Sequence, residues 1–389
     1  MFRFLCRGVG KPNELLFNEY LTKIWCFLET PVLIRCLSTT TNQKSLTVSY
    51  LIGSCGFPED KAIAISKKVQ FDSSSKPDSV ISLLKNYGLP TSYISNLVTR
   101  YPRVLVSDAD KIIKPKIEHL KSLGFCGPNL VKVLSFNLFV LNSSLENRII
   151  PNIVYLKSFV TTDSNMATLL SRSSWILKLN VEKLMAPNIA LLRANGVPDS
   201  YIEKIVVQKP IALMRGPDQF KEIVEEIKKM KFNPLLFSFA KGIVVLTQLS
   251  KSSWEAKFSI YRKYGWSKEV FYMAFRSQPK LMEASAKKIE DTLEFLVNKM
   301  GYDPLLIAEY PTIITFSLDK RIIPRCLVFE LLVSEGLIGK EYNISSILTA
   351  YNEKDFVEKF VTKFQDKIPK VLDVYQGKVK DFEETKELC

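Results

Sequence analysis

The fold is decided by the stretch Tyr101-Pro102-Arg103-Val104-Leu105, because a proline followed by an apolar pair returns at regular intervals along the chain. The same pattern occurs in Lys209-Pro210-Ile211-Ala212-Leu213, Gln278-Pro279-Lys280-Leu281-Met282 and Tyr310-Pro311-Thr312-Ile313-Ile314. A second proline follows thirteen residues later, at Pro115 and Pro324, and Pro151 and Pro187 lie in the same register. A period of about 36 residues indicates a solenoid of stacked repeats.

The second-proline register defines eight anchor positions, at residues 79, 115, 151, 187, 223, 258, 292 and 324. Seven residues before them stand mostly helix-capping residue types: Asp72, Asp108, Ser144, Asn180, Gly216, Lys251, Ser285 and Ser317. Two and five residues after the anchors, apolar residues form an i, i+3 stripe, which is clear in the first four units and degenerate in the later ones. Each unit is therefore predicted to begin with a helix that buries one face.

Each first helix is expected to end at a left-handed glycine, as at Gly88, Gly124, Gly196 and Gly301. A shorter second helix then runs until the next unit's first proline stops it. The fold class predicted is all-α, with eight helix pairs from about Ser66 to Gly336 and no strands. Six stripe residues should be buried: Ile117, Leu120, Ile153, Leu156, Ile189 and Leu192. The second prolines should bend the first helices.

Three regions are predicted along the chain. Residues 1–40 carry Arg3, Arg7, Lys11, Lys23 and Arg35 among apolar residues, and resemble an organellar targeting peptide; an ordered N-terminal helix is the alternative. The helical repeats are expected over residues 47–345. Residues 346–389 should form a helical cap and tail, with Phe356 and Phe360 on one face. No run reaches the roughly 18 apolar residues of a membrane span.

Positive charge predicts an anionic partner. The chain has 54 Lys and Arg against 40 Asp and Glu, a net charge of +14. Residues 1–37 carry five basic and three acidic residues, so the rest of the chain keeps +12. Four residues before the anchors lies a mostly polar column: Ser75, Lys111, Asn147, Lys183, Gln219, Trp254, Lys288 and Lys320. On stacked units this column could contact phosphates, with Trp254 stacking on a base, or it could be a solvated helix face.

Further basic side chains lie at the ends of the predicted second helices or near the second prolines. The candidates at the ends of second helices are Arg100, Arg172, Lys209 and Arg276, and those near the second prolines are Lys116, Arg148, Arg321 and Arg325. For each of them alone, a surface charge paired locally is the simpler interpretation.

The repeat and its flanking phrases resemble the mitochondrial transcription termination factor (mTERF) family, in its land-plant branch. The phrases are Ser49–Phe57, Ser66–Val69, Lys76–Val80 and Pro369–Gly377, and the resemblance runs from about Thr47 to Lys380. It implies a left-handed superhelical α-solenoid in an organelle, mitochondrion before chloroplast. It also implies binding of DNA or RNA along a concave groove, in transcription termination, RNA processing or splicing. The units anchored at Ile223, Phe258 and Thr292 depart from it by lacking the second proline.

An enzymatic function is not expected. The one histidine, His119, has no nucleophile to activate, and the seven cysteines show no metal-binding spacing. No cofactor is predicted, and the protein is expected to be a monomer without a membrane segment. The alternative function is a non-enzymatic helical scaffold for a protein partner in organellar ribosome or splicing assemblies, since solenoids present extended surfaces to either ligand. The sequence does not distinguish DNA from RNA or name a target.

Overall fold

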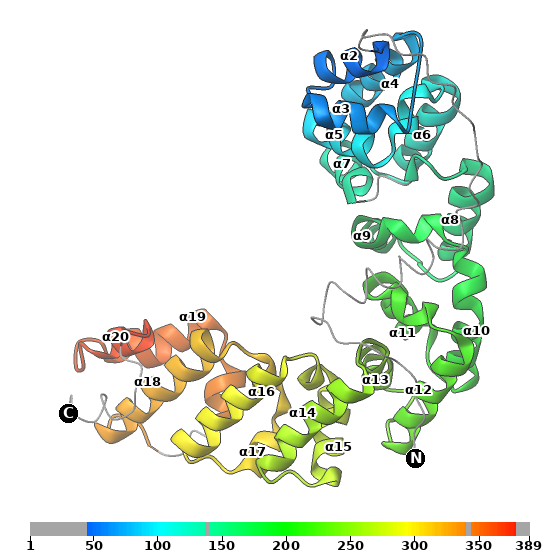
Figure 1. Cartoon of the computed structure of the whole chain (residues 1–389). Helices are drawn as coiled ribbons and strands as arrows, with labels where there is room; N and C mark the ends of the chain where they lie inside the picture. Colours follow the sequence, from blue (N-terminus) through cyan, green and yellow to red (C-terminus); the bar gives the residue numbers. More distant parts are fainter. Residues whose placement is uncertain (1–44, 137–139, 340–343, 379–389) are drawn as a thin grey trace. The chain divides into compact units, whose positions relative to one another are not determined.

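The computed structural model describes residues 45–136, 140–339 and 344–378 (Figure 1). The predicted targeting segment, residues 1–40, lies outside the described residues, as does the end of the predicted tail. The described residues contain helices and no strand, which confirms the all-α fold class. They divide into two compact units, the first ending at Ser74 and the second beginning at Ser75.

The N-terminal unit contains α2 (Leu46–Gly53) and α3 (Glu59–Ser66), which pack on each other. Thr47 joins the start of this unit to its end, because its hydroxyl donates to the Phe71 carbonyl at 3.2 Å and accepts from the Phe71 N–H at 3.0 Å. Tyr50 packs edge-on against the ring of Phe71.

The second unit is a two-layer stack of helices. One layer consists of the first helices of the repeats: α4 (Ser75–Asn86), α6 (Lys114–Ser122), α8 (Ile150–Lys157), α10 (Val181–Ala194), α12 (Pro217–Lys229), α14 (Lys251–Lys263), α16 (Ala286–Leu293) and α18 (Ile323–Ser334). All eight predicted anchor positions fall within these helices.

The other layer consists of the second helices: α5 (Thr91–Arg100), α7 (Gly127–Phe136), α9 (Asp163–Ser173), α11 (Asp199–Gln208), α13 (Phe237–Gln248), α15 (Lys268–Ser277) and α17 (Pro304–Glu309). Neighbours pack on each other from α7 through α17, and α8 packs on α10 and α10 on α12 in the first layer (Figure 1). The repeat prediction is thereby confirmed for these helices.

Short 3₁₀ turns join one repeat to the next, as the first prolines predict. They are η1 (Pro102–Val106), η5 (Ser174–Lys178), η6 (Pro210–Met214), η7 (Pro279–Met282) and η9 (Pro311–Thr315). In four of them a proline stands at the first position. An N–H there would have no partner within the helix, so the absence of one in proline costs no hydrogen bond. The preceding second helix ends two residues before the proline, because the residue before proline avoids helical geometry.

The caps of the first helices lie largely where the sequence places them. Six of the expected residues are N-caps: Asp108, Ser144, Asn180, Gly216, Ser285 and Ser317. The prediction is wrong in two units: Ser250 rather than Lys251 caps α14, and α4 begins three residues after Asp72. At the other ends, Gly88, Gly124, Gly196 and Gly301 have φ between 70° and 86°, as a left-handed C′ position requires.

The second prolines are accommodated by a change in hydrogen-bond register. The π-helical turns η2 (Ala109–Ile113), η4 (Leu145–Ile149) and η10 (Leu318–Ile322) immediately precede the helices that carry Pro115, Pro151 and Pro324. In the first of them, the Ile113 N–H donates five residues back to Asp108. Pro187 instead lies inside α10. The missing proline N–H thus coincides with one wide turn in three of the four helices.

The presence or absence of the second proline marks the change of phase that makes the apolar stripe degenerate in the later units. In helices with the second proline, the buried positions lie eight, nine and twelve residues after the cap, and the six stripe residues predicted to be buried are 0–2% exposed. In the proline-free helices the pattern moves back by one residue, for example to Ile223, Val224 and Ile227 in α12. The buried stripe therefore continues through these units with a shifted phase.

A buried polar residue beside this stripe ties each of several repeats to the next. We call Lys116, Asn152, Asn188, Lys257 and Arg325 the inter-repeat donors. Lys116 Nζ donates to the Leu141 carbonyl at 2.6 Å, and Lys257 Nζ donates to the Met282 carbonyl at 2.7 Å. Burial lowers the pKa of both lysines. The carbonyl oxygens at the ends of the connecting turns are thereby satisfied inside the stack.

Asn152 is the inter-repeat donor whose side chain both donates and accepts hydrogen bonds. Its Nδ2 donates to the carbonyls of Leu177 and Leu179 at 2.9 and 2.7 Å, and its Oδ1 accepts from the Val181 N–H at 3.2 Å. One repeat later, Asn188 Nδ2 makes the two equivalent donating bonds, to the carbonyls of Leu213 at 2.9 Å and Arg215 at 2.7 Å. The amide therefore couples the end of one repeat to the first helix of the next.

Close approach of α12 and α13 depends on Gly242. A Cβ at this position would lie 2.9 Å from Ile227 Cδ1 and 3.1 Å from the Phe232 ring. A larger residue would force these core side chains apart, so the second helix of this unit packs against the first through a glycine.

The C-terminal elements close the stack beyond α18. They are η11 (Ser346–Ala350), α19 (Glu353–Phe356), η12 (Val357–Val361), η13 (Thr362–Phe364) and α20 (Val371–Tyr375), with η8 (Glu294–Lys299) extending α16 earlier in the chain. Phe356 and Phe360 are buried with ring centroids 5.0 Å apart, which confirms their shared face.

Candidate nucleic-acid interface

Five members of the predicted polar column occupy one structurally equivalent position, the third residue after the helix cap, whereas Trp254 lies four residues after its cap and Ser75 is the first residue of α4. The backbone N–H groups of Lys111, Asn147, Lys183, Lys288 and Lys320 donate to their respective cap side chains at 2.8, 3.1, 3.0, 3.2 and 3.3 Å. The side chains of Lys111, Lys183 and Lys320 are exposed. We call these three residues the first-turn lysines.

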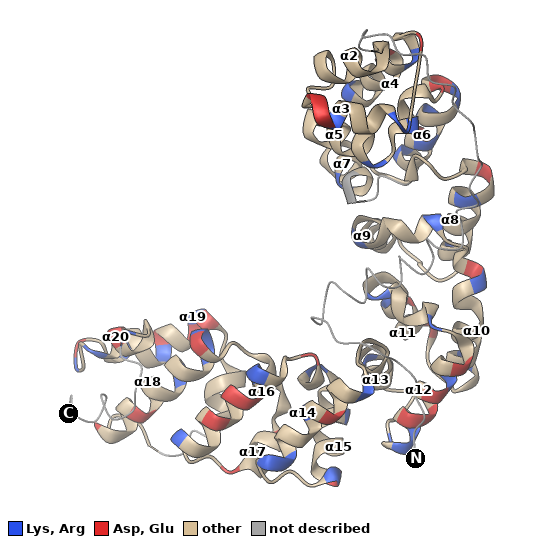
Figure 2. Cartoon of the chain, viewed as in Figure 1, with Lys and Arg blue, Asp and Glu red and all other residues tan. Residues whose placement is uncertain are grey.

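A lysine in the first turn lies at the positive end of the helix dipole, where its charge costs roughly 0.3–1 kcal/mol rather than stabilising the helix. Such a position suits a residue that contacts an external anion. The residue before each first-turn lysine is acidic, however: Asp110, Glu182 or Asp319. Figure 2 likewise shows basic and acidic residues side by side on helices such as α12 and α16. In these three units an acidic residue and a lysine therefore stand next to each other in the first helical turn.

Three of the predicted arginines are exposed at repeated places in the stack. Arg100 and Arg172 lie in the last turns of α5 and α9, where a cation is favoured by the helix dipole, and Arg148 lies in the π-helical turn before α8. The structure leaves these guanidinium groups accessible to a ligand. Whether they contact nucleic acid stays a prediction.

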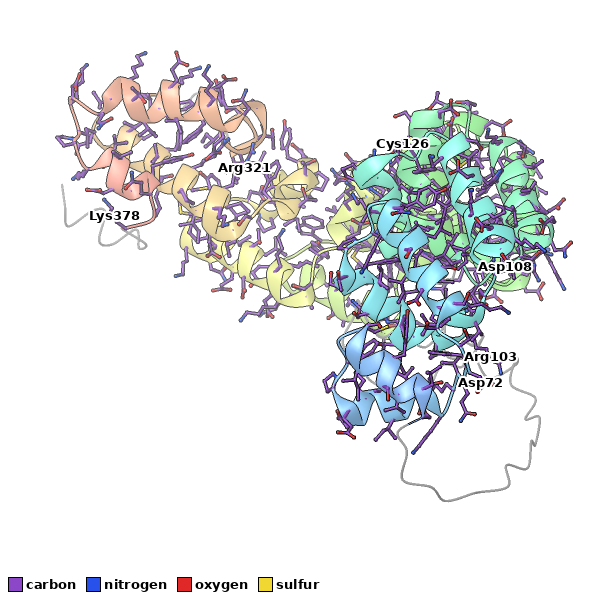
Figure 3. All side chains as sticks on the ribbon, turned by 90° about the horizontal axis from the view of Figure 1, so that it is seen from above. Asp72, Arg103, Asp108, Cys126, Arg321 and Lys378 are labelled. Atoms are coloured by element: carbon purple, nitrogen blue, oxygen red, sulfur yellow. The ribbon has the colours of Figure 1, made fainter. Side chains whose placement is uncertain are left out.

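Four other predicted contact residues have hydrogen-bond or packing partners inside the protein. Lys288 Nζ donates to the Thr315 carbonyl at 2.9 Å, and Arg276 donates to the Met230 carbonyl at 3.0 Å. Arg321, labelled in Figure 3, donates to the carbonyls of Leu348 and Tyr351. Trp254 packs edge-on against Phe271 and Phe275, with centroids 5.6 and 5.2 Å away. Each of these residues therefore has a structural role in the stack.

Arg325 is the most deeply buried of the predicted contact residues, since its side chain is 0% exposed, and Lys116 is buried as well. Its guanidinium donates to the carbonyls of Ile347, Tyr351 and Asn352 and to Glu353 Oε2 at 2.9 Å. It also lies 4.4 Å from the centroid of the Phe356 ring. This arginine anchors the C-terminal elements to α18, so we remove it from the candidate contact set.

A second basic site, missed as a site by the sequence analysis, lies between α11 and α13. A pocket of about 170 Å³ is lined by four lysines, Lys204, Lys209, Lys241 and Lys280, together with one carboxylate, Glu283. Its apolar wall includes Phe237, Ala240 and Val244. We call this feature the lysine pocket. Lys204 lies in α11 and Lys241 in α13. Lys209 directly follows α11, and Lys280 lies in the connecting turn η7 after α15.

Phe237 holds two of these lysines close to each other. The Nζ atoms of Lys204 and Lys241 lie 4.7 and 4.9 Å from the centroid of its ring, so they are no more than 9.6 Å apart. Tyr201 packs beside the same ring at 5.2 Å. Cation–π contact with an aromatic ring contributes about 0.5–1 kcal/mol at exposed sites and favours this arrangement.

The lysine pocket has an excess of positive charge that the protein does not neutralise. Over the part of the chain that the structure describes, no carboxylate lies within 4.0 Å of the ammonium group of Lys204, Lys209, Lys241 or Lys280. At 9.6 Å or less and without salt, two ammonium groups repel each other by at least about 0.4 kcal/mol even at the dielectric constant of water. The upper bound on the separation slightly exceeds the Debye length of about 8 Å at physiological salt, so salt weakens this repulsion without removing it. An anion bound there would relieve this repulsion.

Sequence reasoning had a partial signal for this pocket. Lys209 was recognised as a basic residue at the end of a second helix, but Lys204, Lys241 and Lys280 come from three different elements of three successive repeats. Their convergence depends on the packing of α11 on α13 and of α13 on η7. A search for lysines on the second helix and connecting turn of adjacent repeats would have found it.

The residues with catalytic potential are isolated. His119 is partly buried, and burial is the main cause that lowers its pKa. Cys326 is buried, which raises the pKa of its thiol, while Cys126 is exposed (Figure 3). Among the described residues, no group of three or more His, Cys, Asp or Glu side chains could hold a metal ion. Nor is any described helix both long enough and apolar enough to cross a membrane.

Comparison with known proteins gives one family. The mTERF family model matches residues 81–137 and 131–357, which is most of the second unit. A relative in Arabidopsis thaliana, the mitochondrial transcription termination factor MTEF18, is 36% identical over 87 residues, which cover 22% of this chain and 15% of the relative. A second from the same plant, the mitochondrial transcription termination factor MTERF15, is 21% identical over 153 residues, covering 38% and 33%.

These matches thus span well under half the length of either relative. Both relatives carry the word mitochondrial in their names, which supports the predicted mitochondrial localisation.

Proposed function

Because this chain belongs to the mTERF family, we propose that it is a nucleic-acid-binding factor of mitochondrial gene expression that acts in transcription termination or its regulation. The observation that carries the proposal is the match of the family model over most of the second unit, together with the names of the two relatives. We also propose that the chain is not an enzyme.

The charge distribution supports a polyanionic ligand. The net charge of +14 favours association with nucleic acid, and the exposed basic side chains recur with the repeat. The first-turn lysines and the exposed arginines Arg100, Arg148 and Arg172 are the contact residues that we propose from the predicted set. They would contact the phosphate backbone, which positions a strand but carries no direct sequence information.

Sequencing of nucleic acid that is crosslinked to the protein in intact mitochondria tests the proposal. We expect recovered sequences to concentrate at defined sites of the mitochondrial genome or its transcripts. Crosslinked DNA near transcript ends would support termination, whereas RNA at processing or splice sites would favour the other roles. Failure to recover nucleic acid above the level of an untagged control would contradict the proposal and favour the protein-scaffold alternative.

A further inference from the structure

We propose that the lysine pocket binds a phosphate group of a nucleic-acid strand. This inference rests on the proposed function and adds a contact point that the first-turn lysines do not provide. The pocket is formed by α11, α13 and η7, whereas the first-turn lysines lie on the first helices of the stack. A strand bound there would run past the second helices of successive repeats.

The chemistry of the lining selects a phosphate. Lysine ammonium groups act as compact point charges with three donors each, which suits the several oxygens of a phosphate group. Lys204, Lys209 and Lys280 are exposed, so the anion can approach them from solvent. Ile205, Val244 and Val245 give the pocket an apolar wall, and a charge interaction is stronger beside such a wall than in water.

The contact should be independent of base sequence. Gln208 is the one side-chain amide in the lining, and the remaining polar groups there are the lysines and Glu283. A base edge is read by arrays of donors and acceptors, which these side chains do not form. Phe237 already has two ammonium groups over it, so its role in the pocket is to hold Lys204 and Lys241 in place.

The double variant Lys204→Gln/Lys241→Gln tests the pocket in the full chain. Fluorescent single-stranded and double-stranded oligonucleotides are titrated at several salt concentrations against the wild type and the variant. Because one neutralised phosphate contributes roughly 0.7–0.9 to the slope of log K against log salt, losing the pocket should flatten the slope by about that amount. The loss of affinity should be the same for unrelated sequences.

Lys228→Gln/Lys229→Gln is the matched control. These two lysines lie in α12, carry the same total charge and are exposed on a first helix. The control should keep the wild-type slope. Equal slopes for the pocket variant and the wild type, with the wild type binding normally, would overturn the pocket while leaving the proposed function intact. A wild type that binds no nucleic acid would overturn both.

Lysine acetylation of the wild-type protein gives a measurement that does not depend on how the variant folds. Bound oligonucleotide should protect Lys209 and Lys280 from acetylation at least several-fold more than it protects Lys228. A separate arm uses inorganic pyrophosphate and adenosine triphosphate as the probes. Equal protection by these small molecules at micromolar concentration would overturn assignment to a strand and identify the pocket as a site for free phosphate compounds. Unprotected lysines at saturating oligonucleotide would also overturn it.

Discussion

Replacing Asn152 by alanine should destabilise the contact between the repeats of α8 and α10 by at least about 3 kcal/mol. The side chain is buried and makes three hydrogen bonds, two as donor and one as acceptor. Its removal leaves the carbonyls of Leu177 and Leu179 and the Val181 N–H without their partner. Each unsatisfied buried group costs about 1–3 kcal/mol, so three of them give this lower bound.

Asn188→Ala is the internal comparison for this prediction. Asn188 makes the two donating bonds, but its Oδ1 has no hydrogen-bond partner in the described residues. Its replacement should therefore cost less than that of Asn152 by about one hydrogen bond, or about 1 kcal/mol.

Urea denaturation followed by far-ultraviolet circular dichroism gives the overall change in stability. Hydrogen exchange across α10 then locates the change, because a repeat protein can open locally at a weakened interface. Amide protection should fall first at the N-terminal turn of α10 in the Asn152 variant. A loss below about 1 kcal/mol in both variants, with unaltered exchange, would refute the role assigned to the inter-repeat donors.

Three further predictions concern the core and the C-terminal cap. Leu156→Ala should cost about 2–5 kcal/mol, since Leu156 is 0% exposed; an unchanged urea midpoint would show that the assigned repeat phase is wrong. Arg325→Ala should cost about 3–5 kcal/mol and expose the C-terminal elements to limited proteolysis, because it leaves buried carbonyls without their donor and removes one of the two donors to Glu353. Partial burial alone would raise the pKa of Glu353, but hydrogen bonds from Tyr375 and Arg325 hold it below its ordinary value of 4.5. The stability from this carboxylate is thus present above about pH 4.5 and lost as pH falls through the lowered value; Glu353→Gln should remove this acid-dependent step, and an unchanged acid profile would contradict it.

The repeat register could be predicted from the sequence because it depends on local chemistry. Caps, glycines and prolines act within one turn of the chain, so Asn180 and Gly196 indicate the ends of α10 before any packing is known. The apolar stripe at Ile189 and Leu192 then identifies the buried face. These signals failed where the proline was absent, because the phase of the buried positions changed by one residue.

The roles of the charged residues could not be predicted in the same way. Arg325 and Lys288 look like surface cations in the sequence, but they donate to backbone carbonyls 22 to 27 residues away. One available signal was the position of Lys116, Asn152, Asn188 and Arg325 immediately before an apolar stripe residue. A polar residue there is buried by its neighbours and must find an internal partner. The lysine pocket required knowledge of which helices pack together.

Direct titration of the full chain with DNA and RNA tests the central claim. Wild-type protein is titrated with fluorescent duplex DNA, single-stranded DNA and RNA at several salt concentrations, beside the triple variant Lys111→Ala/Lys183→Ala/Lys320→Ala. We predict binding by the wild type that weakens as salt rises, with a slope that the triple variant flattens by about 2 to 3. Absence of salt-dependent binding to all three ligands by folded wild-type protein would contradict nucleic-acid binding as the function of this chain.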